Sequence, residues 1–265
     1  GHWRSGTTYM HQLLASDPAA ATVRNSLMVA PQVAVLLRSL IVLLLARLMS
    51  ARRPIDAVAW GPEDPQEDEL CVAKLTLDTN MAGVAFPLDY LIHFRRSVLL
   101  TTRRFERLWL DITRLTWLHD GAGRSHLVIK NPAHTDRVPM VLKHFPKARF
   151  IFLNREPIDS IRSLVQVKQR MSGLVGLQPL PTEITQVEDT VTAHRELIQA
   201  FETSRQLIPA GQLIEVNYAD LIQQPFAVVE RIYEAFGLPS WSTAQAPIRQ
   251  RIEQSSTYRA DPVAL

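Results

Sequence analysis

The residues best suited to chemistry stand at the start of the chain, in residues 1–8 (GHWRSGTT). Gly1 and Gly6 have the spacing of the two glycines of a phosphate-binding loop, and Thr7 and Thr8 close it. Such glycines let consecutive backbone N–H groups turn inward around an anion, at which the positive N-terminus of the next helix also points. The sequence therefore predicts an anion site here, with a tight turn before an amphipathic helix as the structural alternative.

The loop lacks the lysine that nucleoside triphosphatases place on the β- and γ-phosphates. Thr7 occupies that position, and the nearest fixed cation is Arg4, inside the loop. A triphosphatase also needs a magnesium ion held by a carboxylate. Because a less charged anion can be bound without either group, the loop favours a ligand other than a nucleoside triphosphate.

Arg155 is a second candidate for binding an anion. It follows a strand expected over residues 149–153, and Ser163 comes eight residues later in the next helix. Ligands of open α/β sheets bind at the carboxyl ends of the strands. Arg155 is therefore expected at a ligand site, and an ion pair with Glu156 or Asp159 is the structural alternative.

A turn rich in acidic residues is the third candidate. Residues 63–69 hold five carboxylates, and residues 66–72 have the composition of the first turn of a helix. Acidic residues at a helix N-terminus complement the helix dipole. Five of them, in a chain that is basic overall, exceed what capping requires, so we expect a functional carboxylate among them.

Helices and strands that alternate along the chain must position these residues. Apolar residues at three- and four-residue spacing predict helices over residues 9–14, 102–119, 182–208 and 225–236. Short apolar runs predict strands over residues 125–129, 149–153 and 212–218. The first two strands are expected to be parallel neighbours in a βαβ unit, with Thr135 capping its helix. Residues 76–95 give no clear pattern. The order predicts a three-layer α/β/α fold with a central parallel sheet and P-loop-like topology.

Length and composition limit the classes of function. The 265 residues, of which 46% are apolar and 21% charged, suffice for one globular domain. A net charge of +3 and a pI near 9.2 are too mild for a nucleic-acid surface but suit an anionic ligand. The single cysteine, Cys71, favours a reducing, cytoplasmic compartment and an inert buried thiol. Because no strand precedes the loop, we expect a single domain over residues 1–265 that is truncated before the loop and open to truncation at its C-terminus.

The loop and the Arg155–Ser163 spacing, present in this order, resemble the sulfotransferases that use 3′-phosphoadenosine 5′-phosphosulfate (PAPS). The resemblance covers most of residues 1–240 and is strongest to the bacterial-type enzymes. It extends to residues 65–69 (PQEDE), 130–134 (KNPAH) and 217–221 (NYADL). It implies a P-loop-like nucleotide-binding fold, PAPS as co-substrate and in-line sulfuryl transfer to a hydroxyl or amine, for which no metal is needed.

The resemblance also implies roles for individual residues. The 5′-phosphosulfate is expected against Arg4, Ser5, Gly6, Thr7 and Thr8, and the 3′-phosphate against Arg155 and Ser163. Tyr9 stands where many cytosolic members have a tryptophan beside the adenine, and a core tyrosine is the alternative reading.

The general base is left open by the resemblance. The cytosolic enzymes have a histidine two residues after a lysine, whereas here Lys130 is followed by Asn131 and Pro132, and His134 comes at the fourth position. Glu67 is favoured because like-charged neighbours make a carboxylate a better proton acceptor. His134 is the alternative base, and Lys130 is expected to assist the leaving bridging oxygen.

The acceptor is the least defined part of the prediction. Residues 33–49 are rich in leucine, but their longest uncharged run is eight residues, far below the roughly 18 needed to span a bilayer. A helix buried on most sides is favoured, with an interfacial helix at a membrane surface or the wall of an apolar pocket as alternatives. This run suggests a lipophilic alcohol, whereas the arginines of residues 103–114 would suit an acidic glycan. A P-loop kinase and an inactive nucleotide-binding module are the rival functions.

Overall fold

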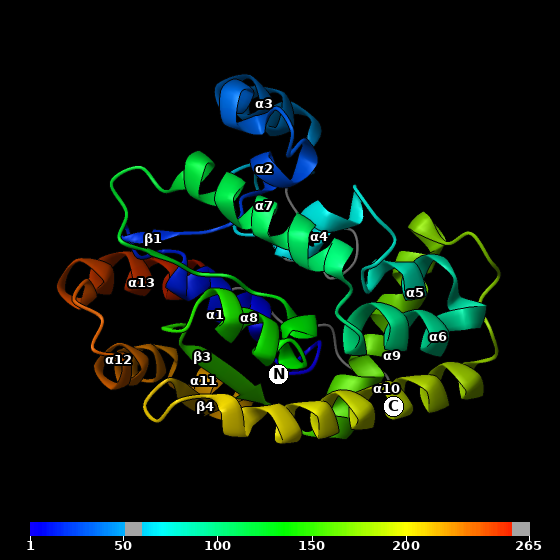
Figure 1. Cartoon of the computed structure of the whole chain (residues 1–265). Helices are drawn as coiled ribbons and strands as arrows, with labels where there is room; N and C mark the ends of the chain where they lie inside the picture. Colours follow the sequence, from blue (N-terminus) through cyan, green and yellow to red (C-terminus); the bar gives the residue numbers. More distant parts are fainter. Residues whose placement is uncertain (51–59, 256–265) are drawn as a thin grey trace.

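The structure, a computed structural model, describes residues 1–50 and 60–255. Short strands alternate with helices along the chain (Figure 1). In chain order the elements are α1 (Thr7–Leu14), β1 (Ala20–Ala21), α2 (Asn25–Val29), α3 (Ala34–Leu48), α4 (Asp68–Ala73), α5 (Met81–Ala85), η1 (Pro87–Asp89), α6 (Tyr90–Phe94), η2 (Arg95–Leu99), α7 (Arg103–Asp120), β2 (His126–Leu127), η3 (Pro132–Thr135), α8 (Val138–His144), β3 (Phe150–Asn154), α9 (Pro157–Val175), α10 (Glu183–Ser204), η4 (Arg205–Leu207), β4 (Leu213–Asn217), α11 (Tyr218–Gln223), α12 (Pro225–Phe236) and α13 (Trp241–Ser255).

The described strands pair in parallel, which confirms the predicted α/β class. β3 lies beside β4 along its whole length, and β1 lies beside β2. The expectation that residues 125–129 and 149–153 pair with each other is wrong, because each of these strands pairs with a different partner in the described part of the chain. The partner of β2 consists of Ala20 and Ala21, two small residues that give no strand signal in the sequence.

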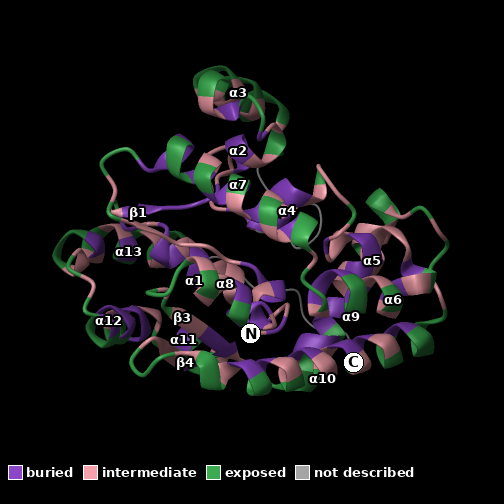
Figure 2. Cartoon of the chain, viewed as in Figure 1, coloured by how far each residue is buried: buried purple, intermediate pink, exposed green. Residues whose placement is uncertain are grey.

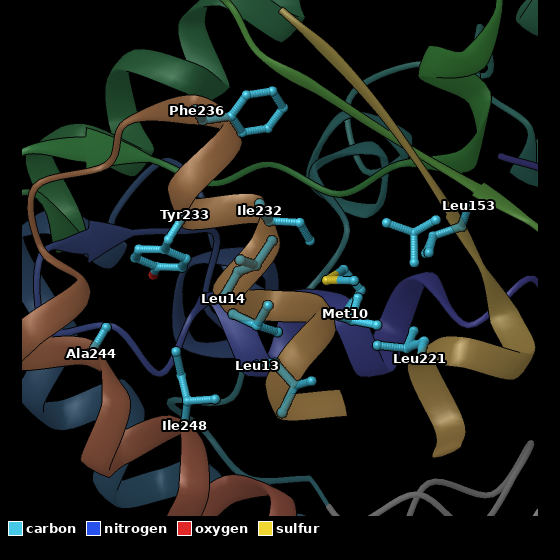
Figure 3. Close-up of a cluster of buried hydrophobic side chains, with 13 residues drawn as sticks. Met10, Leu13, Leu14, Leu153, Leu221, Ile232, Tyr233, Phe236, Ala244 and Ile248 are labelled. Atoms are coloured by element: carbon cyan, nitrogen blue, oxygen red, sulfur yellow. The ribbon is translucent and has the colours of Figure 1, made fainter. Parts of the chain in front are cut away.

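Helices cover both faces of the β3–β4 pair. Leu153 and Val216 point to one face, where they join a buried apolar cluster with side chains of α1, α11, α12 and α13 (Figure 3). Phe152 points to the other face and stacks on Phe201 of α10, with ring centroids 4.1 Å apart. Successive strand residues point to opposite faces, so Phe152 and Leu153 contact helices on the two sides of the strand pair. The result is the predicted arrangement of three layers.

The predicted helices are confirmed, with small shifts at their ends. Thr102 caps α7 by accepting a hydrogen bond from the backbone N–H of Phe105. The helix expected over residues 182–208 ends at Ser204, and the turn η4 follows it. Gly237 ends α12 in the left-handed conformation, with φ of 55°.

Some local structure differs from the prediction or was not predicted. Thr135 does not cap α8. It lies in η3, and its hydroxyl donates to the backbone O of Gly1 at 3.0 Å. Residues 76–95 form α5, η1 and α6, short helices beside α9 and α10, and α13 packs on α1 and α12 beyond the last predicted helix.

Helix α4 is fixed by a second buried cluster, formed with α7 and α8. Cys71 and Val72 of α4 pack there with Trp109 and Ile112 of α7. Burial raises the pKa of the Cys71 thiol, so the side chain stays protonated and apolar, as expected of an inert thiol. This packing holds the start of α4 and therefore the acidic turn of residues 63–69.

Helix α3 lies at the edge of the molecule and is mostly exposed (Figure 2). The prediction of a helix buried on most sides is wrong, because Leu36 is 86% and Leu48 80% exposed and Ala34 is the buried residue of the helix. Arg38 ties α3 to the protein by hydrogen bonds to the backbone O of His119 and to the carboxylate of Glu63. Among the described residues, no helix has the length and apolarity needed to cross a bilayer.

Candidate active site

The backbone of the glycine-rich loop is left-handed at two residues. Arg4 has φ of 66° and Gly6 φ of 90°. Left-handed non-glycine residues are uncommon and cluster at ligand sites, and here the two flank Ser5 in the manner of anion-binding backbone nests. A Cβ at Gly6 would lie 2.7 Å from Cδ2 of Tyr218, so only glycine permits this approach. The first N–H groups of α1, which begins at Thr7, have no partner within the helix and point to the same place.

Three residues predicted to bind the nucleotide meet beside this loop. Nε of Arg4 donates a hydrogen bond to Oγ of Ser163 at 2.9 Å. Nη1 of Arg155 donates to the backbone O of Arg4 at 2.7 Å. Arg155 follows β3 and Ser163 lies in the first turns of α9, so two elements distant from the loop in sequence form hydrogen bonds with Arg4, Arg155 as the donor and Ser163 as the acceptor. The Arg4 side chain points toward the pair expected to bind the 3′-phosphate.

Arg155 retains unused capacity to donate hydrogen bonds. Its Nε is buried and has no hydrogen-bond partner among the described residues. A buried guanidinium N–H that is left unpaired costs free energy. An anion bound at this position would remove that cost.

Tyr218 is a site residue to which the sequence analysis assigned no role. The guanidinium of Arg155 lies over its ring, 4.3 Å from the centroid, and the same ring faces Gly6. Tyr218 therefore orients the guanidinium and shapes the loop at once. The signal was its place as the last residue of a predicted strand, at the edge of the sheet where ligands bind.

Glu67 and Lys130 form an ion pair that reaches the start of α1. Nζ of Lys130 is hydrogen-bonded to Oε1 of Glu67, and it also lies 3.4 Å from Oγ1 of Thr8. The side chains of Lys130 and Glu67 are 9% and 20% exposed. The loop is thus bordered by Arg155 and Ser163 on one side and by Lys130 and Glu67 on the other.

His134 lies in a neighbouring but separate network. Its Nε2 is 2.7 Å from Oδ2 of the buried Asp68. Asp68 also accepts hydrogen bonds from Nε1 of Trp109 at 2.7 Å and from Nδ2 of Asn131 at 2.9 Å. Burial by itself would raise the pKa of Asp68, but the charge of His134 and these hydrogen bonds outweigh it and lower the pKa. Nδ1 of His134 is buried and has no hydrogen-bond partner in the described part of the chain.

Each carboxylate of the acidic turn has its own basic partner. The five pairs are Glu63 with Arg38, Asp64 with Arg251, Glu67 with Lys130, Asp68 with His134 and Glu69 with Arg137. Ion pairing therefore accounts for all five carboxylates, and the expectation that one of them is functional stays a prediction. What distinguishes Glu67 is its position beside Lys130 and the loop.

Two more of the predicted nucleotide-binding residues, Ser5 and Tyr9, contact the backbone and the core. Ser5 is buried, and its hydroxyl donates to the backbone O of His2 at 2.7 Å, which braces the loop from inside. Tyr9 is half-buried against the cluster of α1, α12 and α13, and burial raises the pKa of its phenol. This location fits the alternative reading of Tyr9 as a core residue, and its contact with adenine stays a prediction.

The site contains anion-binding groups and a carboxylate. Within residues 1–50 and 60–255, His, Cys, Asp and Glu side chains nowhere form a group of three suited to a metal ion. The chemistry available to the residues themselves is anion binding, charge neutralisation and proton transfer.

The chain is similar in sequence and in fold to sulfotransferases. The curated relatives include the omega-hydroxy-beta-dihydromenaquinone-9 sulfotransferases Stf3 of Mycobacterium bovis and Mycobacterium tuberculosis. Each is 25% identical over 270 residues, which cover 100% of this chain and 68% of the relative.

Two solved structures share the fold. Sulfotransferase STF9 from Mycobacterium avium matches with a TM-score of 0.81 at 21% identity, over 98% of this chain and 68% of that one. Sulfotransferase STF1 from Mycobacterium tuberculosis matches with a TM-score of 0.63 at 18% identity, over 93% of this chain and 68% of that one. The sequence profile of the sulfotransferase family matches residues 1–243, which contain the loop, Glu67, Lys130, Arg155 and Ser163. On this match, the chain belongs to the sulfotransferase family.

Proposed function

We propose that this sulfotransferase moves the sulfuryl group of PAPS to the hydroxyl of a lipid alcohol. The observation that carries the proposal is the arrangement of two groups around one loop. Arg155 and Ser163 meet Arg4 on one side, and Lys130 links Thr8 to Glu67 on the other. A nucleotide with phosphates at both its 3′ and 5′ positions can place the 3′-phosphate against Arg155 and Ser163, whereas ATP has no phosphate at that position.

The residues near the loop fit the nucleotide in charge and in hydrogen bonding. Arg155 and Arg4 are cations, and the unpaired Nε of Arg155 is a donor that a phosphate oxygen can satisfy. In this proposal Arg155 and Ser163 hold the 3′-phosphate, with Tyr218 as a support behind the guanidinium. The loop and the start of α1 hold the 5′-phosphosulfate, where the backbone of Arg4 lies.

At the other end, Glu67 acts as the general base. It takes the proton from the acceptor hydroxyl while the oxygen–sulfur bond forms. Lys130, which contacts both Glu67 and Thr8, stabilises the charge left on the phosphate oxygen when its bond to sulfur breaks. The products are a sulfate ester and adenosine 3′,5′-bisphosphate. PAPS supplies only the activated sulfuryl group, so the protein positions the reactants, neutralises charge and removes one proton.

Access favours Glu67 over His134 as the base. The Glu67 side chain is 20% exposed beside the loop. Nε2 of His134 is occupied by Asp68, and its Nδ1 is buried. An acceptor hydroxyl can therefore approach Glu67 without rearrangement, whereas it can reach His134 only if the Asp68 contact breaks.

A lipid alcohol is proposed as acceptor for two reasons. The mycobacterial relatives are named for omega-hydroxy-beta-dihydromenaquinone-9, a substrate with a hydroxyl on a lipid-like molecule. In this chain, α3 exposes leucines, and Arg38 of the same helix contacts Glu63 in the turn that carries Glu67. The acidic-glycan alternative rests on the arginines of α7, of which Arg114 is already paired with Asp111.

Nucleotide preference tests the first half of the proposal. Calorimetry should show tighter binding of adenosine 3′,5′-bisphosphate than of ATP, because ATP has no 3′-phosphate for Arg155 and Ser163. Arg155→Ala should weaken bisphosphate binding about tenfold to a hundredfold, since a charge-assisted hydrogen bond contributes about 1.5–3 kcal/mol. Arg162→Ala, an exposed neighbour on α9, is the matched control and should bind normally. Equal affinity for ATP, or an Arg155→Ala variant that binds like the wild type, contradicts the assignment.

Acceptor screening tests the second half. The full-length protein is incubated with radiolabelled PAPS and three acceptors, namely a hydroxylated isoprenoid lipid, a short water-soluble alcohol and an acidic glycan. We expect label in the lipid at the highest rate. Preferential labelling of the glycan would replace the lipid assignment, and the absence of transfer to any acceptor despite bisphosphate binding would support an inactive nucleotide-binding module.

A further inference from the structure

Helix α3 presents a continuous apolar stripe to solvent. Beyond the irregular turn at Leu37, the exposed leucines Leu40, Leu44 and Leu48 recur at four-residue spacing, with Leu43 beside them. Leu40 is 51%, Leu44 46% and Leu48 80% exposed. Residues at this spacing share one face of a helix. A contiguous patch of large apolar side chains on a protein surface marks an interaction site.

The charges of α3 indicate the kind of surface that covers the stripe. Residues 34–48 contain no Asp or Glu, and their charged residues are Arg38 and Arg47. Arg47 is exposed in the last turn, one residue from Leu48. A long cationic side chain beside apolar ones fits the boundary between acyl chains and anionic headgroups, because its stem lies along the apolar region and its charge reaches the headgroups.

The end of α7 next to α3 has the same character. Arg38 is hydrogen-bonded to the backbone O of His119 in the last turn of α7. Trp117 and Leu118, just before it, are 42% and 68% exposed. Tryptophan is enriched where proteins meet the interfacial layer of a membrane.

Contacts connect α3 with the turn that carries the proposed base. Arg38 of α3 is paired with Glu63, and Glu63 also accepts a hydrogen bond from Oγ of Ser26 at 2.8 Å. In the same turn, Nε2 of Gln66 donates to Oδ1 of Asn25 at 3.0 Å. Gln66 directly precedes Glu67, so the exposed helix and the base belong to one braced unit.

We propose that the leucine stripe of α3, with Arg47, docks the enzyme on the surface of an anionic lipid bilayer. The helix lies in the interface and does not cross it, because 15 residues interrupted by two arginines are shorter than the roughly 20 apolar residues that a span requires. Docking there places the bilayer against the helix whose Arg38 contacts Glu63, in the turn that carries Glu67. The benefit for catalysis rests on the proposed lipid alcohol acceptor, whereas the binding to lipid does not.

Vesicle binding without nucleotide or acceptor tests the docking directly. The full chain is sedimented with vesicles of phosphatidylglycerol and phosphatidylcholine. The triple variant Leu40→Gln, Leu44→Gln, Leu48→Gln should bind at least about tenfold more weakly than the wild type. The matched control is the triple variant Ile184→Gln, Val187→Gln, Val191→Gln, at side chains that are 73%, 40% and 44% exposed. These residues lie on α10, on the opposite side of the molecule from α3 (Figure 1). The control should bind as the wild type does.

Further arms separate the explanations. Vesicles of phosphatidylcholine alone, or the Arg47→Gln variant, should reduce binding severalfold if anionic headgroups are recognised. Equal vesicle binding by the α3 triple variant and the wild type overturns the proposal. The proposal is also overturned if the wild type does not bind vesicles but forms a dimer in light scattering and the α3 variant does not. The stripe would then be a contact between two copies of the chain. Transfer to a water-soluble alcohol, measured in parallel, should be equal in the α3 variant and the wild type. Loss of vesicle binding with that rate intact separates docking from the chemistry.

Discussion

Glu67 and Asp68 are adjacent in the sequence, yet their side chains belong to environments of opposite character. Glu67 is the N-cap residue of α4, and its carboxylate meets Lys130 at a partly exposed position beside the loop. Asp68 is one residue further, in the first turn, and its carboxylate is buried among His134, Trp109 and Asn131. The backbone change at the start of the helix turns two like residues in different directions.

The difference shows how a helix N-terminus can separate catalysis from stability. A base must release and take up protons during turnover, which requires access and few fixed hydrogen bonds. A carboxylate with three buried donors is stabilised in its ionised form and orients the groups around it. Glu67 therefore suits the chemical step, and Asp68 suits the support of His134, Asn131 and the segment that carries Lys130.

The largest expected effect is on turnover, from Glu67→Gln. Glutamine keeps the size of the side chain and an oxygen for Lys130 but cannot accept the proton, so kcat should fall by about 10²–10⁴-fold. Bisphosphate affinity, measured by calorimetry, should change little because Glu67 lies away from Arg155 and Ser163.

Asp64→Asn is the control for this variant. Asp64 is in the same turn but is paired with Arg251 at 3.1 Å, and its loss should leave kcat nearly unchanged. If Glu67→Gln turns over almost normally while His134→Ala is inactive with nucleotide binding intact, the roles of the two pairs are reversed.

The next effect is on stability, from Asp68→Asn. The substitution removes the ionised partner of His134 and weakens three buried hydrogen bonds, so the free energy of unfolding should fall by about 3 kcal/mol. Urea unfolding followed by circular dichroism measures it. Asp64→Asn, whose carboxylate is 28% exposed, should cost less than about 1 kcal/mol.

The stabilisation by Asp68 should depend on pH. Burial opposes ionisation of Asp68, but His134 and the hydrogen-bond donors lower its pKa in the folded protein. A lowered pKa means that the unfolded chain binds the proton more readily, so the stabilisation is present above the unfolded pKa and is lost as pH falls through the folded one. The stability gap between wild type and Asp68→Asn should narrow below about pH 4. A gap that widens in acid would contradict the assignment.

The sequence was informative where a single local pattern decides the structure. Residues 102–119 carry a helix pattern, and α7 covers Arg103–Asp120. The grouping of Arg4, Arg155 and Ser163 was predictable because a glycine-rich loop and the end of a parallel strand must meet at one edge of a sheet. These features depend on few contacts between segments that are distant in the sequence.

The sequence was uninformative where a contact between distant segments decides. The partner of β2 is a pair of alanines whose strand pairing comes from the surrounding packing and not from propensity. The exposure of α3 is decided by the contacts of Arg38 with His119 and Glu63, which hold the helix at the edge of the fold. The partners of the acidic turn, such as Arg137 and Arg251, lie far along the chain, so composition alone could not show that Glu69 and Asp64 were already paired.

The smallest effect is expected at Thr8, where the proposed catalytic pair meets the loop. Its Oγ1 is 3.4 Å from Nζ of Lys130, a long contact beside the much closer one to Glu67. Thr8→Val keeps the shape of the side chain and the backbone N–H groups of the loop, so bisphosphate affinity should stay within about threefold. Removing the hydroxyl frees Lys130 to shift toward Glu67, so kcat should fall by less than about tenfold, consistent with a weak hydrogen bond.

Thr8→Ser restores the hydroxyl without the methyl group and should recover most of the rate. A loss in Thr8→Val as large as that in Glu67→Gln would show that Thr8 contacts the reacting group itself. The division of labour between the two sides of the loop would then have to include α1, since Thr8 lies in its first turn. A loss in affinity without a loss in kcat would instead place Thr8 with Arg155 and Ser163, on the side of the loop that binds the nucleotide.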